Sequence, residues 1–214
     1  MPRTRLAFDT AAYDHLRRSD RRMGALVERV GPPTLTLERL GDPYAALVRS
    51  IVYQQLTGKA AATILGRVCA LHGSEAVPSP AQVLATRDAR LRAAGLSTAK
   101  TAALKDLARR AHAGEIPSYR SLVRMTDDAI VERLTEVRGI GRWSVEMMLI
   151  FRMGRPDVWP VGDYAVRKSY AALHGLDELP SVRALEQLGE PYRPFRSAAA
   201  WYLWRALDTA TPGS

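Results

Sequence analysis

Apolar residues recur at helical spacing through most of this 214-residue chain. Tyr44, Leu47, Val48, Ile51 and Val52 occupy positions i, i+3, i+4, i+7 and i+8, which lie on one face of an α-helix. Evidence for strands is thin, because the clearest alternating run, residues 34–37, is short and isolated. The periodicity therefore predicts an all-α fold of about ten short helices.

Capping residues mark where several of these helices begin. Asp42, Ser97 and Thr126 are N-cap candidates, each just ahead of an apolar helical stripe. The segment Arg142–Met153 is apolar on nearly every side, which predicts a helix of about 12 residues in the middle of the molecule. We expect a single unit over residues 1–214, with lobe A at about 44–142 and lobe B at about 1–43 plus 143–214.

The chain is strongly basic, with 31 lysine plus arginine residues against 22 acidic ones and a formal charge of +9. Such an excess suits a polyanion such as DNA or RNA. The lysines are Lys59, Lys100, Lys105 and Lys168 alone, so an arginine-rich composition set by the genome is a second interpretation. Charge by itself leaves both interpretations open.

Cys69 is the single cysteine. It excludes a disulfide framework, a four-cysteine zinc site and a four-cysteine iron–sulfur cluster. A reducing cytoplasm is the simplest compartment for such a chain. The longest apolar run, near residues 147–151, is far too short to span a bilayer, so we expect no membrane association.

A tight turn, Arg138-Gly139-Ile140-Gly141, separates two helical patterns. Its glycines permit backbone conformations that other residues disfavour. The first amide groups of the helix after the turn would point outward, where they could hold a phosphate oxygen without any side chain. An ordinary helical hairpin that ends on a glycine is the alternative interpretation.

Further segments surround this turn in a particular order. LTEVRGIGRWSVEMM contains the turn, and DVWPVGDY, at 157–164, adds a loop rich in glycine and proline followed by an aspartate. LVRSIVYQQLTGKAA and LRAAGLSTAKTAAL precede these segments, and RPFRSAAAWYLW follows them. Together, over about residues 16–207, they resemble the alkylpurine (3-methyladenine type II) DNA glycosylases of the helix–hairpin–helix superfamily.

The resemblance implies an enzyme that hydrolyses the N-glycosidic bond of alkylated purines, of the 3-methyladenine and 7-methylguanine type, in base excision repair. It also implies base flipping out of duplex DNA and an active-site cleft between the lobes. Asp163 matches the catalytic aspartate. It also precedes the helical pattern Tyr164–Leu173, so it is an N-cap candidate, and a helix N-terminus favours the ionised carboxylate. A capping role alone is the alternative.

Trp143 stands where relatives that also cut the DNA strand carry a nucleophilic lysine. No amine is available at that position to form a Schiff base. The resemblance therefore implies a monofunctional glycosylase, without lyase activity, that leaves an abasic site.

Aromatic side chains attract a cationic purine by stacking. By resemblance, Trp143, Met147, Trp204 and Tyr53 form the base pocket, whereas we assign Trp201, Tyr202 and Met148 to the core.

The junction of two helices at residues 53–57 offers the residue that fills the gap left by a flipped base. Gln55 matches the intercalating position of the family, with Leu56 as the alternative, and some relatives have a leucine there. The resemblance places the following residues against DNA: Gln54, Thr57, Lys59, Leu96, Ser97, Lys100, Arg138, Gly139, Ile140, Gly141 and Arg142. For Lys100 a solvated helical charge is an equal alternative, and for Gln54 a buried, satisfied amide.

Relatives also hold a monovalent cation on main-chain carbonyls, which here match Thr135, Val137 and Gly139. No other cofactor and no catalytic metal is implied. We expect a monomer that binds damaged duplex DNA, and no extra N-terminal β domain of the kind that longer relatives carry. A non-enzymatic helix–hairpin–helix DNA-binding module and a glycosylase for another lesion remain as alternatives.

Overall fold

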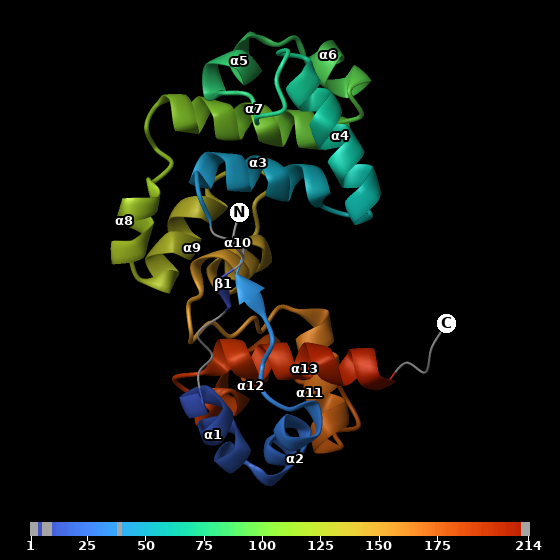
Figure 1. Cartoon of the computed structure of the whole chain (residues 1–214), viewed down its shortest axis with the longest axis vertical. Coiled ribbons are helices and arrows are strands. Elements are labelled where there is room, and N and C mark those ends of the chain that lie inside the picture. Colours follow the sequence, from blue (N-terminus) through green and yellow to red (C-terminus); the bar gives the residue numbers. More distant parts are fainter. Residues whose placement is uncertain (1–3, 6–9, 38–39, 211–214) are drawn as a thin grey trace. The chain divides into compact units, whose positions relative to one another are not determined.

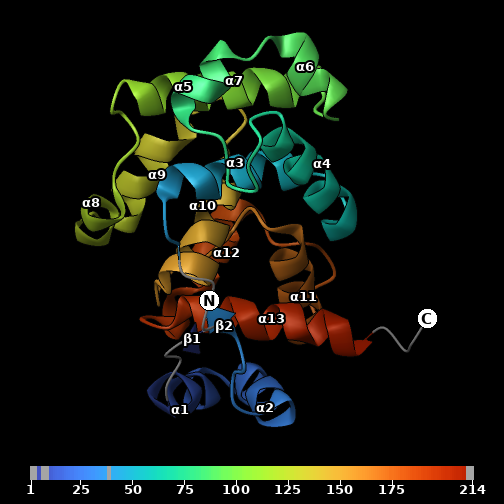
Figure 2. The same ribbon diagram turned by 45° about the horizontal axis from the view of Figure 1, so that its top comes forward.

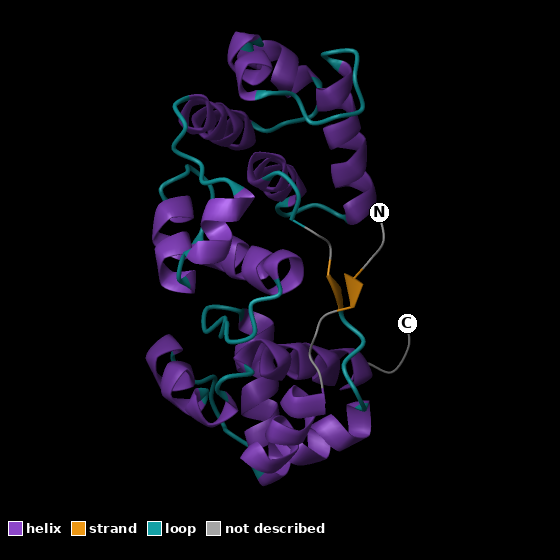
Figure 3. Ribbon diagram, turned by 60° about the vertical axis from the view of Figure 1, so that its left-hand side comes forward, coloured by secondary structure: helices purple, strands orange, loops and turns teal. Residues whose placement is uncertain are grey.

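The computed structural model describes residues 4–5, 10–37 and 40–210 and divides into two compact units (Figure 1). Unit 1 consists of Met1–Arg39 with Glu146–Ser214, and unit 2 of Leu40–Val145. Helices dominate both units, and the one strand pair among the described residues joins β1 (Thr4–Arg5) to β2 (Thr36–Leu37) in antiparallel fashion (Figure 3). The predicted all-α fold is confirmed.

Unit 2 is built around the long helix α7. Its helices are α3 (Pro43–Tyr53), α4 (Gly58–Ala70), α5 (Pro80–Ala85), α6 (Asp88–Ala93), α7 (Thr98–His112), α8 (Tyr119–Arg124), α9 (Asp127–Thr135) and the start of α10 (Arg142–Met148). α7 packs against α3 on one side and α5 on another, and α3 also packs against α4 (Figures 1 and 2). The predicted caps Asp42, Ser97 and Thr126 each accept backbone N–H groups of the following helix.

Unit 1 packs helices from both ends of the chain. They are α1 (Thr10–Ser19), α2 (Arg21–Val30), the π-helix η1 (Leu149–Met153), α11 (Tyr164–His174), α12 (Val182–Leu188), the 3-10 helix η2 (Glu190–Tyr192) and α13 (Arg196–Ala210). α13 packs against α11 and α2, and α1 packs against α2 (Figure 1). The core between them includes Leu16, Met23, Trp159, Tyr192 and Tyr202, all buried.

The segment predicted as one helix from Arg142 to Met153 is helical throughout, but its last five residues form the π-helix η1. Val145, Leu149 and Ile150 are fully buried, in agreement with the all-round apolar pattern. The segment ends at Gly154, whose φ of +67° suits a glycine, and a Cβ there would lie 2.9 Å from the Leu37 side chain. At this close approach the end of η1 packs against β2.

The described residues form thirteen α-helices, more than the number predicted. The additions are α1, α2 and α8. α8 has only six residues and gives a weak signal. α2 has two clear signals that sequence reasoning overlooked: Met23, Leu26 and Val27 are buried at helical spacing, and Asp20 accepts the N–H groups of Arg22 and Met23 and caps the helix. The boundary between the units falls within α10, between Val145 and Glu146.

Candidate functional site

Asp163 is held rigidly at the start of α11. Its Oδ1 accepts the backbone N–H of Val166 at 2.8 Å and the indole Nε1–H of Trp204 at 3.2 Å. The residue is 8% exposed, and its own backbone has the extended conformation of an N-cap. The predicted capping role is thus confirmed, and it coexists with a second donor that no cap requires.

The ring of Trp204 brings α13 against η1 at this point. It stacks on Phe151 with ring centroids 5.4 Å apart and an interplanar angle of 29°. Trp204 and Phe151 are both half-buried, so part of this aromatic pair remains accessible beside the carboxylate. Sequence reasoning had included Trp204 and missed Phe151, although its position eight residues after Trp143 on the same helical segment is an available signal.

The other predicted pocket residues divide between the units. Met147 is half-buried in unit 1, whereas Trp143 and Tyr53 belong to unit 2 and are 51% and 37% exposed. Exposed aromatic rings are a common means of stacking on a ligand. Trp201, Tyr202 and Met148, which the sequence assigned to the core, are indeed buried.

Contacts within unit 2 fix the hairpin turn, residues 138–141. The Arg138 backbone N–H donates to Oδ2 of Asp106 at 2.9 Å, and the Ile140 N–H donates to the Val137 carbonyl at 3.0 Å. Gly139 has a φ of +78°, and a Cβ on it would lie 3.1 Å from the Cβ of Ala103. The backbone conformation therefore favours glycine there, and the close packing against Ala103 adds to that preference.

Exposure separates the two ways in which the residues predicted to contact DNA can do so. Arg138, Gly141 and Arg142 are exposed, as is Lys59 on α4. The Ile140 and Leu96 side chains are only 4% and 3% exposed. For these two residues a DNA contact is therefore left to the main chain.

The loop between α3 and α4, residues 54–57, carries the two wedge candidates at its tip. Gln55 is exposed with a φ of +56°, a left-handed conformation that is uncommon for a residue other than glycine. Leu56 is 39% exposed. Thr57 caps α4 by accepting the Ala60 N–H, and the Gln54 side chain donates to the Gly139 carbonyl at 2.8 Å. Gln54 therefore joins this loop to the hairpin turn.

Lys100 requires a correction. The sequence placed its ammonium against DNA or in solvent, but Nζ donates to the carbonyls of Val52 at 2.8 Å and Gln54 at 2.7 Å. Burial lowers the pKa of this lysine. The ammonium is thus directed at the C-terminal end of α3. Ser97, at the start of α7, accepts the Lys100 N–H and caps that helix.

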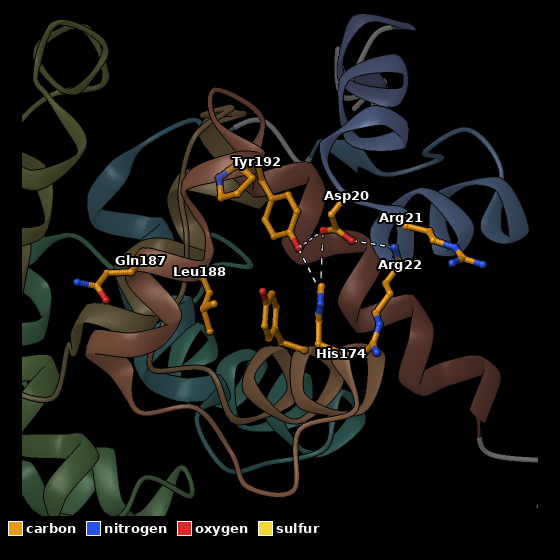
Figure 4. Close-up of a pocket in the computed structure, with 9 residues that line it drawn as sticks. Asp20, Arg21, Arg22, His174, Gln187, Leu188 and Tyr192 are labelled. Carbon is orange, nitrogen blue, oxygen red and sulfur yellow. Dashed lines mark hydrogen bonds and ion pairs between the residues drawn. The ribbon is translucent and has the colours of Figure 1, made fainter.

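A second polar cluster lies at the other end of α11, in unit 1. It lines a cavity of about 400 Å³ and centres on Tyr192, whose hydroxyl donates to Asp20 at 2.7 Å and lies 3.3 Å from Nε2 of His174 (Figure 4). The His174 ring also stacks on Tyr170. α11 runs for eleven residues between Asp163 and Gly175, a length of roughly 16 Å, so this cavity and the Asp163 carboxylate lie at opposite ends of the helix. It is a separate feature of the unit.

A third cluster fixes the loop before Asp163. The Asp157 carboxylate accepts from Arg196 Nε at 2.7 Å and from Arg193 Nη1 at 2.6 Å. Ser197, at the start of α13, donates to the Arg155 carbonyl and accepts the Val158 N–H. These contacts join the loop to α13, the helix that supplies Trp204. Sequence reasoning missed them, because the partners are about 40 residues apart in the chain.

The metal predictions concern backbone atoms. Among the described residues, His, Cys, Asp and Glu side chains form no cluster able to hold a metal ion. The carbonyls of Val137 and Gly139, two of the expected cation ligands, each accept one hydrogen bond, from Ile140 and Gln54. A carbonyl oxygen has two lone pairs, so both retain capacity for a cation. No helix among the described residues is long and apolar enough to cross a membrane.

Two features characterise the fold of this chain. A helical hairpin with a glycine turn is followed in the sequence by a buried aspartate at the start of a helix. The chain belongs to the HhH-GPD superfamily of base excision DNA repair proteins, whose family model matches residues 48–194.

Individual relatives agree with this assignment. The chain is 37% identical to DNA-3-methyladenine glycosylase 1 of Schizosaccharomyces pombe, over 94% of this chain and 89% of that protein. The structure of a 3-methyladenine DNA glycosylase of that yeast in complex with abasic DNA superposes with a TM-score of 0.80 at 35% identity, covering 95% of this chain and all of that one. A DNA-3-methyladenine glycosidase from Bacillus halodurans gives 0.83 at 31% identity, over 98% and 94% of the two chains.

Proposed function

We propose that this protein is a monofunctional DNA glycosylase that removes alkylated purines, of the 3-methyladenine and 7-methylguanine type, from duplex DNA and leaves an abasic site. The observation that carries the proposal is the Asp163 carboxylate, buried at a helix start and oriented by both Val166 and Trp204. The names of the relatives in yeast and Bacillus support the same lesion class.

The reaction suits an ionised carboxylate. In an alkylated purine the base already carries positive charge, so the electron pair of the broken C1′–N bond leaves with it and no strong general acid is needed. The sugar becomes cationic as the bond breaks. A fixed carboxylate close to that sugar stabilises the charge and can accept a proton from the water that attacks C1′. Two N–H donors on Oδ1 suit an acceptor of this kind and not an acid.

Chemistry on a base requires its extrusion from the helix. Trp204 and Phe151 beside Asp163 supply aromatic surface for the extruded cationic purine. Trp143, Met147 and Tyr53 stay predicted contacts of that base, on the resemblance to the family. Gln55 or Leu56 fills the gap. The hairpin amides, with Arg138 and Arg142, hold the phosphate backbone without reading the sequence.

Two subsidiary proposals follow from the residues at the hairpin. Trp143 offers no amine for a Schiff base, so strand cleavage is not part of the reaction. The carbonyls of Thr135, Val137 and Gly139, at the C-terminal end of α9, suit a monovalent cation, which would add positive charge near the bound phosphate.

The decisive experiment compares Asp163→Asn with Asp42→Asn on a methylated duplex. Asn caps a helix about as well as Asp, and Asp42 caps α3 by accepting the N–H groups of Tyr44 and Ala45, so both variants should fold normally. Base release should be lost in Asp163→Asn by about 100-fold or more and kept in Asp42→Asn. DNA affinity should survive in both variants.

The same assay separates the alternatives. Near-normal release by Asp163→Asn would remove the catalytic assignment. DNA binding without release from any lesion duplex would identify a non-enzymatic binding module. Strand breaks before alkali treatment, or a covalent adduct after borohydride reduction, would contradict the monofunctional assignment.

A further inference from the structure

The end of α3 is closed by a side chain from α7. The last carbonyls of a helix lack partners within the helix and need outside donors. Lys100 Nζ supplies two hydrogen bonds, to Val52 inside α3 and to Gln54 just after it. Its positive charge also lies at the negative end of the helix dipole.

Gln54 is therefore held twice. Its carbonyl accepts from Lys100, and its side-chain amide donates to the carbonyl of Gly139 in the hairpin turn. A single residue thus links α7, the loop of residues 54–57 and the hairpin turn.

α7 also contacts the hairpin turn directly, through residues spaced three apart after Lys100. Ala103 lies one turn further along, and its small side chain is what allows the close approach of Gly139. Asp106 lies one turn beyond Ala103 and accepts the backbone N–H of Arg138. One face of α7 thus presents a cation to two carbonyls, a methyl group to a glycine and an anion to an amide.

We infer that this face of α7, formed by Lys100, Ala103 and Asp106, is a template that fixes the wedge loop (residues 54–57) and the hairpin turn relative to each other before DNA binds. The inference rests on the proposed function, because it assigns the two fixed segments to the same bound duplex. Lys100 is thereby a positioning residue that acts through Gln54.

The conformation of the wedge loop agrees with this role. Gln55 has a left-handed backbone conformation that other surroundings must maintain. Its neighbours are fixed on both sides, since Gln54 is held as described and the Leu56 N–H donates to the Tyr53 carbonyl at 3.3 Å. The left-handed conformation therefore falls at Gln55, the residue whose side chain is proposed to enter the DNA.

A lysine suits the position better than an arginine. The ammonium is a compact charge whose three donors can reach two carbonyls of one helix end, whereas a guanidinium is planar and larger. Restoring the charge as arginine should therefore fail to restore the geometry. A phosphate contact, in contrast, would tolerate that exchange.

The test measures binding to a duplex with a stable abasic-site analogue, which needs no catalysis. Lys100→Met and Lys100→Arg should both weaken binding about tenfold. Because no phosphate contact is lost, the slope of log affinity against log salt should stay at the wild-type value. Lys59→Met, which removes an exposed lysine of α4, is the comparison. If Lys59 contacts a phosphate, that variant should lower the magnitude of the slope by about one.

A double-mutant cycle gives the second readout. If Lys100 acts by positioning the wedge loop, replacing it should cause almost no further loss of DNA affinity in a protein that already carries Gln55→Ala and Leu56→Ala. Additive losses, rescue by arginine or a reduced salt slope would each overturn the inference. Should Lys100→Met unfold, Gln54→Ala removes the link to Gly139 and is expected to give the same non-additive pattern. A wild-type protein that binds the abasic duplex but releases no base would contradict the proposed function and leave this test intact.

Discussion

The indole N–H of Trp204 and the backbone N–H of Val166 donate to the same oxygen of Asp163. The helix start alone would supply the second of these bonds. The first comes from α13, about 40 residues further along the chain, and it sets the angle at which the carboxylate faces its surroundings. A role beyond helix capping is the simplest reason for a tryptophan at this place.

Replacing Trp204 by phenylalanine tests that relationship. The ring remains for stacking on Phe151, but the donor to Asp163 is lost. We expect the rate of base release to fall about tenfold, because a hydrogen bond to a charged group is removed. Trp159→Phe is the matched control: its Nε1–H donates to the Leu185 carbonyl in the core, so stability should fall while the rate per folded molecule is retained. An unchanged rate in Trp204→Phe would show that the bond is incidental.

The two glycines of the hairpin turn should respond differently to alanine. Gly139 has a positive φ, and an added Cβ would make a tight contact of 3.1 Å with Ala103, so Gly139→Ala should lower the free energy of unfolding by about 1–2 kcal/mol. Gly114→Ala, with a φ of +75° and nothing within 4 Å of the added Cβ, gives the cost of backbone strain alone.

Gly141 has no such constraint, and a Cβ there meets nothing within 4 Å. Gly141→Ala should therefore leave stability almost unchanged, yet weaken DNA binding about tenfold, because the methyl group occupies the space where a phosphate approaches the amides. Urea denaturation and DNA titration separate the two effects. Normal DNA affinity in Gly141→Ala would contradict the proposed backbone contact.

Local signals made most of the fold predictable. Caps such as Asp42, Ser97, Thr126 and Asp163 were placed correctly, because a capping side chain acts within three residues of its own position. The π-helical end of the 142–153 segment was not predicted, and its contact with β2 joins residues more than 100 positions apart, which no local pattern reveals. α2 was missed although its local signals are clear: the cap Asp20 is followed by a buried stripe of Met23, Leu26 and Val27.

For the candidate site, sequence reasoning identified residues but not their partners. Asp163 and Trp204 were both named, whereas the bond between them joins two helices far apart in the chain. Lys100 shows the opposite outcome. A lysine in the first turn of a helix is expected to face solvent or phosphate, and only the tertiary structure brings the end of α3 to its ammonium.

The cluster at the C-terminal end of α11 should make stability depend on pH. Burial lowers the pKa of His174, an effect that Asp20 partly opposes and Arg22 reinforces. The unfolded chain binds a proton near pH 6.5 that the folded protein resists, so stability should fall as the pH drops below about 6.5. His174→Gln should make that fall shallower in urea denaturation at pH 5 to 7. Replacing the exposed His112 is the control, and an identical pH profile in His174→Gln would exclude this source.

The thiol of Cys69 should be unreactive in the folded protein. It lies in α4 with 2% of its surface exposed, and burial raises the pKa of its thiol, an effect that Arg49 only partly offsets. Since the thiolate is the reactive form, an aromatic disulfide reagent should label no thiol under native conditions and react once urea unfolds the chain. Cys69→Ala should remain unlabelled in both states and release bases at the wild-type rate. Rapid labelling of the folded protein would mean that α4 opens readily. Because Thr57, the last residue of the wedge loop, caps α4, the loop would then lack the rigid support on which its role depends.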